Sequence, residues 1–67
     1  MDEDVIRLAI QALDAEIAKE PQNARLYMER GRLRMSLGEH VAAMNDLKEA
    51  ANLNPSLIGG IEGKFTN

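Results

Sequence analysis

The sequence of 67 residues predicts an all-α fold, in which three antiparallel helices are followed by a short C-terminal tail. Apolar residues recur at helical spacing in both halves of the stretch 24–57. Gly38 lies between these halves, where the end of a helix needs a residue that tolerates positive φ. Pro21 and Pro55 end the helices that precede them, because the residue before a proline is disfavoured in the helical conformation.

The first predicted helix spans residues 3–19. Its start is acidic, which complements the helix dipole and offers side chains that can cap free N–H groups; these residues are Asp2, Glu3 and Asp4. An apolar stripe with the period of an α-helix predicts the face that packs on the rest of the chain. The stripe comprises Ile6, Ile10, Leu13 and Ile17, widened by Val5, Ala9 and Ala12.

The second predicted helix spans residues 24–37 and carries two apolar strips. One strip comprises Leu26, Leu33 and Leu37, and the other comprises Tyr27, Met28, Gly31 and Met35. A helix with two apolar strips contacts two neighbours, so this helix is predicted to lie in the middle, with Gly31 allowing a close approach. Arg30 and Arg34 lie between the strips.

The third predicted helix spans residues 40–53. Its packing surface comprises Ala43, Met44, Leu47, Ala50 and Ala51. The tail, 58–67, contains three glycines, each of which costs about 1 kcal/mol inside a helix. We therefore expect the tail to be irregular, or to form a short helical segment.

The chain has an internal period of 34 residues, the interval between Pro21 and Pro55. The same shift aligns Ala43 with Ala9, and it aligns Leu47 with Leu13. A fixed period of this length is typical of helical repeats. The sequence divides accordingly into a full repeat over 24–57, a preceding half repeat over about 3–23 and the tail.

This pattern resembles the tetratricopeptide repeat family, whose unit is a helix–turn–helix of 34 residues. The matching residues are Tyr27, Gly31, Ala43, Leu47 and Pro55. Arg30 stands where the family has leucine, and Arg34 stands where it has tyrosine. The resemblance implies an α-solenoid fragment that acts as a protein-interaction module, with the first helix of the repeat lining the concave face.

Charge alternates along the three helices. Residues 2–20 carry six acids and two bases, a net charge of −4, whereas residues 24–37 carry four arginines and one glutamate, a net charge of +3. Residues 39–53 are acidic again, with a net charge of −2. A basic helix between two acidic ones favours packing in the order of the sequence.

The sequence predicts no enzymatic activity, metal site or cofactor. There is no cysteine, and a single histidine, His40, can build neither a metal site nor a catalytic triad. The segment Gly59 to Lys64 resembles a phosphate-binding loop, but Ile58 and Phe65 occupy the positions that require glycine and Ser or Thr.

Location and partners follow from the same composition. The acidic N-terminus is unlike a signal peptide, and no apolar run reaches the ~18 residues of a membrane span, so we expect a cytoplasmic protein without membrane contact. The net charge of −3 argues against nucleic acid. A helix-turn-helix DNA reader is disfavoured because the arginines precede the turn, whereas base readout uses the helix after it.

The expected function is to bind a protein or peptide, with acidic sequences favoured, on the concave face of the second helix. The residues assigned to this face are Arg25, Met28, Arg32, Met35 and Ser36. Arginine pairs well with carboxylates, and methionine adapts to varied apolar partners. The carboxylate clamp of the family needs lysine and asparagine from several repeats, so recognition of chaperone tails is not expected.

Two alternatives remain open: a self-associating structural unit, or a fragment of a longer array without a separate function. Helix three lacks a following repeat to cover it, which predicts a homodimer. The residues assigned to that interface are Met44, Leu47, Ala51, Leu57, Ile58, Ile61 and Phe65. Glu16 and the arginines Arg30 and Arg34 all depart from the repeat pattern, so we also predict an ion pair between Glu16 and one of the two arginines.

Overall fold

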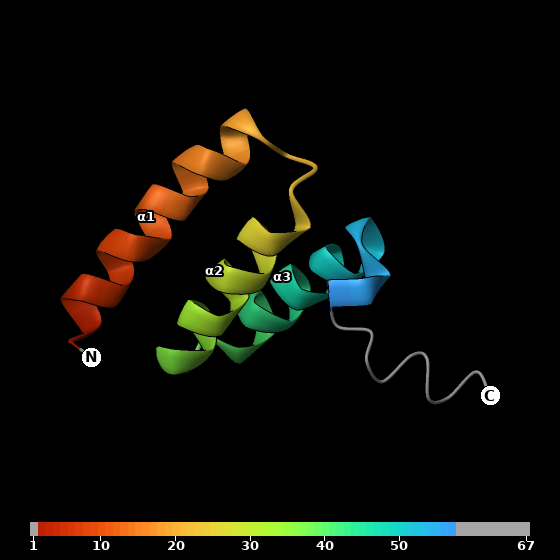
Figure 1. Cartoon of the computed structure of the whole chain (residues 1–67). Coiled ribbons are helices and arrows are strands. Elements are labelled where there is room, and N and C mark those ends of the chain that lie inside the picture. Colours follow the sequence, from red (N-terminus) through yellow and green to blue (C-terminus); the bar gives the residue numbers. More distant parts are fainter. Residues whose placement is uncertain (1, 58–67) are drawn as a thin grey trace.

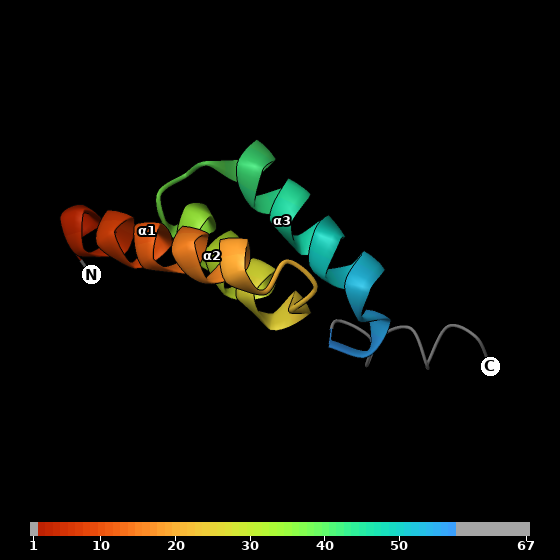
Figure 2. The ribbon, with the colours of Figure 1, turned by 90° about the horizontal axis from the view of Figure 1, so that it is seen from above.

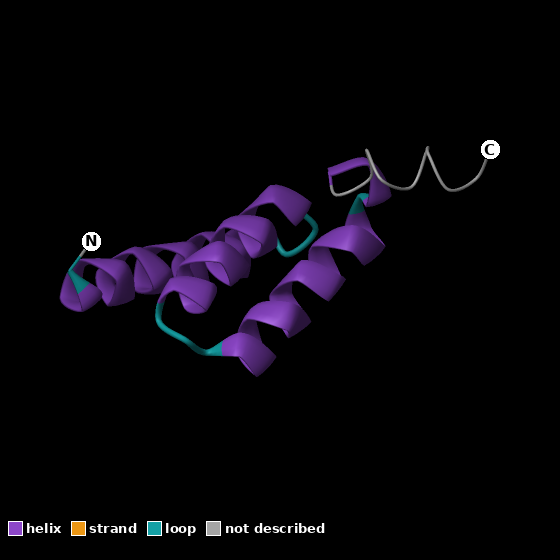
Figure 3. Cartoon of the chain, turned by 90° about the horizontal axis from the view of Figure 1, so that it is seen from below, coloured by secondary structure: helices purple, strands orange, loops and turns teal. Residues whose placement is uncertain are grey.

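The computed structural model describes residues 2–57, which form an antiparallel array of three α-helices (Figure 1). Helix α1 spans Glu3–Lys19, α2 spans Ala24–Ser36 and α3 spans His40–Leu53. A short 3-10 helix, η1, follows at Pro55–Leu57. The described residues contain no strand (Figure 3), which confirms the predicted fold class. No helix in this part of the chain has the length and hydrophobicity needed to cross a bilayer.

Helix α1 begins and ends at the predicted residues. The side chain of Asp2 accepts a hydrogen bond from the N–H of Asp4 at 3.2 Å and so caps the first turn. At the other end, the N–H of Glu20 donates to the carbonyl of Glu16 at 2.8 Å. Pro21 follows directly, and the helix stops there because proline disfavours the helical conformation of its predecessor.

The turn between α1 and α2 is fixed by three side-chain hydrogen bonds. Asn23 caps α2 by accepting from the N–H of Arg25 at 3.2 Å, and its amide also donates to Glu20 at 3.0 Å. The hydroxyl of Tyr27 donates to the carbonyl of Pro21 at 2.9 Å. The tyrosine therefore ties the first turn of α2 back to the residue that ends α1.

The turn between α2 and α3 depends on Gly38. This glycine has a φ of +80°, the left-handed conformation that the sequence analysis predicted there. Its N–H donates to the carbonyl of Met35 at 3.0 Å, and the N–H of Glu39 donates to the carbonyl of Arg34 at 2.9 Å, which is the Schellman pattern of a helix C-terminus. Leu37, predicted as the last helical residue, is the cap, so α2 ends one residue earlier than expected.

Helix α2 is the middle helix, as predicted, because it packs on both α1 and α3 (Figures 1 and 2). The core between α2, α3 and η1 is built on Ala24, Met28 and Ala50, with Tyr27, Leu47, Leu53 and Leu57 packed against it. On the other side, Ile6 and Leu13 are the buried residues of α1, and Leu26 is buried on α2.

Gly31 sets the distance between α2 and α3. A Cβ atom at this position would lie 3.1 Å from the carbonyl oxygen of Ala43 and 3.2 Å from both Asp46 Cβ and Leu47 Cδ2. Only a residue without a side chain allows this approach unless the neighbours shift. The structure thus confirms the close contact predicted at Gly31.

Candidate partner-binding groove

An open groove of about 430 Å³ runs between α1 and α2. Its apolar lining comes from both helices: Ala9, Ala12 and Leu13 from α1, and Leu33 from α2. Glu16, Glu29 and Arg32 complete the lining with charged groups. All three charged residues are exposed, so the groove joins an apolar lining to charges that solvent can reach. This combination suits an amphipathic partner better than a wholly apolar one.

The groove forms where small side chains face a larger one. Ala9 and Ala12 do not fill the space opposite Leu33, although Leu13 is buried with only 8% of its surface exposed. Ala9 is half-buried and Ala12 is exposed, so both alanines are less buried than Leu13. Small residues on the α1 side of the interface therefore leave room for side chains from outside.

The exposed face of α2 beside the groove is a stripe of four residues with helical spacing: Arg25, Glu29, Arg32 and Ser36. Three of them belong to the predicted concave face. The fourth, Glu29, was not predicted as a site residue. Within residues 2–57, neither Arg25 nor Arg32 forms an ion pair. Guanidinium groups in such exposed positions suit pairing with a carboxylate of a partner.

Met28, which was predicted as a partner-binding residue, lies in the core of the structure. Only 9% of Met28 is exposed, and it packs with Ala24 and Ala50 in the core between α2 and α3. It lies about 100° around the helix from Glu29, which takes the exposed position instead. The position of α3, which the periodicity of one helix does not determine, decides which of the two residues is buried.

Met35 and Ser36 lie at the C-terminal end of α2, beyond the groove. Met35 is 38% exposed, and its sulfur lies 3.0 Å from Nδ1 of His40 at the start of α3. The hydroxyl of Ser36 donates to the carbonyl of Arg32 at 3.3 Å. Both residues remain at the surface, but neither lines the groove.

Arg25 lines a second, smaller hollow of about 290 Å³ at the opposite end of α2. The other residues around it are Gln22, Asn23, Ala24, Leu53, Asn54 and Leu57. Arg25 and Arg32 therefore belong to one exposed stripe but border two different depressions. Seven residues separate them along the helix, a rise of ~10.5 Å.

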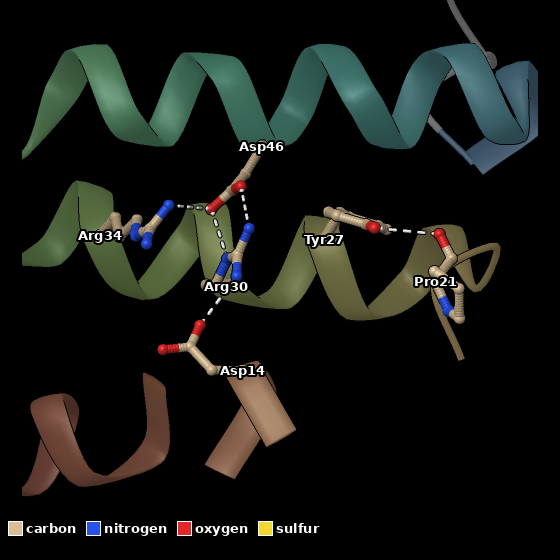
Figure 4. A network of polar contacts seen from close by, with 6 residues as sticks. All are labelled: Asp14, Pro21, Tyr27, Arg30, Arg34 and Asp46. Carbon is tan, nitrogen blue, oxygen red and sulfur yellow. Dashed lines mark hydrogen bonds and ion pairs between the residues drawn. The ribbon is translucent and has the colours of Figure 1, made fainter. Parts of the chain in front are cut away.

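A network of charged side chains crosses all three helices on another side of α2 (Figure 4). Arg30 donates two hydrogen bonds to Asp46 on α3, from Nε at 3.0 Å and from Nη2 at 2.7 Å. Its third contact runs from Nη1 to Asp14 on α1 at 2.7 Å. Arg34 also donates to Asp46, at 2.9 Å. Arg30 thus joins the outer helices through the middle one.

The predicted ion pair of Glu16 with Arg30 or Arg34 is wrong. Asp14 provides the carboxylate on α1, and Asp46, which the sequence analysis had left out, provides the main one on α3. Two residues separate Asp14 from Glu16, a turn of about 200° around α1, so the two side chains lie on nearly opposite sides. Glu16 lines the groove instead.

The central side chains of this network, Asp46 and Arg30, are largely buried, so the network contributes to the packing of the three helices. The side chain of Asp46 is 5% exposed, that of Arg30 16% and that of Asp14 50%. The pKa of Arg30 lies above its ordinary value, first because its hydrogen bond to Asp46 stabilises the charged guanidinium, although burial opposes the shift. The contribution of this charged group to the stability of the folded protein is therefore fully present below the ordinary pKa of arginine. It is lost only as pH rises through the raised pKa that Arg30 has in the folded state. The guanidinium carbon of Arg30 also lies 5.6 Å from the ring centre of Tyr27, within cation–π range.

The residues assigned to self-association have different positions. Met44 is 57% exposed, and the more exposed Val41 lies near it on α3. Leu47 and Leu57, by contrast, pack against the core of their own chain, and Ala51 is half-buried. Both leucines therefore contribute to packing within the chain, and their assignment to an outer interface stays a prediction. Ile58, Ile61 and Phe65 lie outside the described residues.

Comparison of the chain with models of protein families, with curated proteins and with solved structures finds no match. The resemblance to tetratricopeptide repeats therefore stays a prediction from the sequence. The class that the fold defines is an all-helical protein with three antiparallel helices in its described part.

Proposed function

We propose that this protein is an interaction module that binds an amphipathic segment of a partner protein in the groove between α1 and α2. The observation that carries the proposal is the lining of that groove. Apolar side chains from two helices surround about 430 Å³ of open space, and Arg32 lies beside them without an ion pair in the described part of the chain. Apolar side chains of the partner enter the groove, and a carboxylate pairs with Arg32.

A helical partner fits the spacing of the cationic groups. Recognition of a helix in a groove uses apolar anchors that recur every three or four residues. Arg25 and Arg32 are one heptad apart on α2, so carboxylates seven residues apart on a helical partner span the same ~10.5 Å. Glu29 lies between the two arginines and favours a basic or neutral partner residue at the middle position. The favoured ligand is therefore an amphipathic helix with acids flanking its centre.

The internal period of the sequence also supports an interaction module. The repeat boundaries at 24–57 enclose α2, α3 and η1, and the preceding half repeat encloses α1. In a helical repeat array the exposed face of the first helix is the usual binding surface. If the chain is such a repeat, the exposed stripe of Arg25, Glu29 and Arg32 corresponds to that surface.

The test uses short helical peptides selected from a displayed library on the immobilised protein. We expect enrichment of sequences that combine apolar residues at helical spacing with acids. Arg32→Glu should lower the affinity of a selected peptide by about tenfold, or ~1.4 kcal/mol, because it places two carboxylates in contact. Added salt should weaken binding to the wild-type protein as well.

Lys48→Glu provides the matched control. Lys48 is an exposed residue of α3, away from the groove, and its reversal changes the net charge by the same amount. The control should bind the selected peptide with nearly wild-type affinity. Equal losses in Arg32→Glu and Lys48→Glu would contradict a site at the groove, since they would reflect only the total charge of the protein.

A further inference from the structure

Helix α1 has a second apolar face, on the side away from α2. Leu8 is 64% exposed and Val5 is 49% exposed. Successive helical residues are turned by about 100°, so Leu8 lies about 160° from the buried Ile6. Ala12 and Ala15 follow Leu8 at intervals of four and three residues and are exposed too. No other described element covers this face of the helix.

Opposite charges lie at the two ends of this face. Asp4 precedes Leu8 by four residues, and Lys19 follows Ala15 by four residues. All four side chains share one side of α1, and both charged residues are exposed. Within residues 2–57, neither Asp4 nor Lys19 takes part in an ion pair. Along α1, this face therefore carries an acid, a large apolar residue, a small apolar residue and a base, which are Asp4, Leu8, Ala15 and Lys19.

We propose that a second copy of this chain covers this face, with the two α1 helices antiparallel about a two-fold axis. Asp4 and Lys19 are equally far from the midpoint of the face, between Gln11 and Ala12. Antiparallel pairing about that midpoint places Asp4 of each copy beside Lys19 of the other. Leu8 of each copy then packs on Ala15 of the other, where the small side chain leaves room.

The charge pattern selects this arrangement over a parallel one. Two parallel α1 helices in register would bring Asp4 against Asp4 and Lys19 against Lys19, and like charges in contact are unfavourable. Antiparallel helices also place opposite ends of the two dipoles together. A two-fold contact uses the same patch on both copies, so a face that is complementary to itself in this way fits a homodimer.

The proposed dimer face shares only Ala12 with the groove. Ala12 lies at the edge of both surfaces, but Leu8, Ala15, Asp4 and Lys19 do not line the groove. Because the contact involves one helix from each copy, it falls below the ~800 Å² per partner of a stable complex. We therefore expect a dimer whose population depends on protein concentration.

Sedimentation equilibrium over a wide range of concentrations tests the proposal with charge reversals. The wild-type chain should show reversible dimerisation. Asp4→Lys and Lys19→Glu should each weaken it by about tenfold or more, because each change opposes like charges at both ends of the contact. An equimolar mixture of the two variants should associate as well as the wild type, since every end then joins a cation to an anion.

The controls make each outcome decisive. Glu49→Lys and Lys48→Glu on α3 change the net charge in the same two ways at exposed positions and should leave dimerisation unchanged. Leu8→Ser should weaken dimerisation without changing a charge. This variant keeps the test valid if Asp4→Lys unfolds the start of α1. A wild-type chain that stays monomeric throughout, or a mixture that fails to restore association between two folded variants, would overturn the proposal.

Discussion

Asp46 Cβ lies 3.2 Å from the point that a side chain on Gly31 would occupy. The missing side chain of Gly31 therefore makes room for the one buried carboxylate among the described residues. Asp46 accepts hydrogen bonds from Arg30 and Arg34. These arginines lie one residue before Gly31 and three residues after Gly31 on α2. A buried acid between two bases therefore joins α3 to α2 at the close contact of the two helices.

Gly31→Ala should destabilise the fold by about 1 kcal/mol. Alanine favours a helix interior over glycine by ~1 kcal/mol, but overpacking a tight contact costs ~1–3 kcal/mol. Here the new methyl group meets the backbone oxygen of Ala43 at 3.1 Å, and a backbone atom cannot rotate away. Thermal unfolding followed by circular dichroism measures the change. A variant more stable than the wild type would mean that α3 moves away freely.

Removal of Asp46 should have a much larger effect than removal of Asp14. Asp46→Ala leaves two arginines near the interior without their main partner, a loss of about 3–5 kcal/mol. Asp14 is half exposed, so Asp14→Ala should cost less than ~1 kcal/mol. Urea denaturation of both variants provides the comparison. If Asp46→Ala does not fold, the milder Asp46→Asn should still be clearly less stable than Asp14→Asn. Similar losses from both positions would contradict the burial of Asp46.

Double-mutant cycles should separate the observed partners of Arg30 from the one that the sequence suggested. Arg30→Met combined with Asp14→Asn should show a small favourable coupling energy, because the two side chains are 2.7 Å apart. The same arginine variant combined with Glu16→Gln should show none, since Glu16 is turned about 160° from Asp14 around α1 and lines the groove instead. Coupling with Glu16 that exceeds the coupling with Asp14 would reverse this assignment.

The sequence predicted helix positions well because their ends depend on local chemistry. Asp2, Asn23 and Gly38 act on backbone groups within three residues, and Pro21 and Pro55 directly follow the residues that cap the ends of α1 and α3. Such signals do not depend on the rest of the fold. Only the last residue of α2 differed, where Leu37 is a cap and not a helical residue.

The sites were harder to predict because they depend on how the helices rotate against one another. Met28 and Glu29 are adjacent in sequence, and the position of α3 decides which of them is exposed. The groove could not be predicted from either helix alone, because Ala9 and Ala12 of α1 and Leu33 of α2 line it together. The burial of Asp46 could have been predicted from the sequence. Asp46 lies three residues after Ala43 and four residues before Ala50, on the packing face of α3, where an acid requires a partner.

The most direct test of the proposed binding site is a titration of the isotope-labelled protein with a selected amphipathic peptide, followed by amide NMR spectra. The proposed site predicts the largest shift changes at residues around the groove, with Ala12, Arg32 and Leu33 among them. Val41 and Met44, exposed on the outer face of α3, should be unaffected. Shift changes concentrated at Val41 and Met44, with the groove residues unchanged, would contradict the proposal.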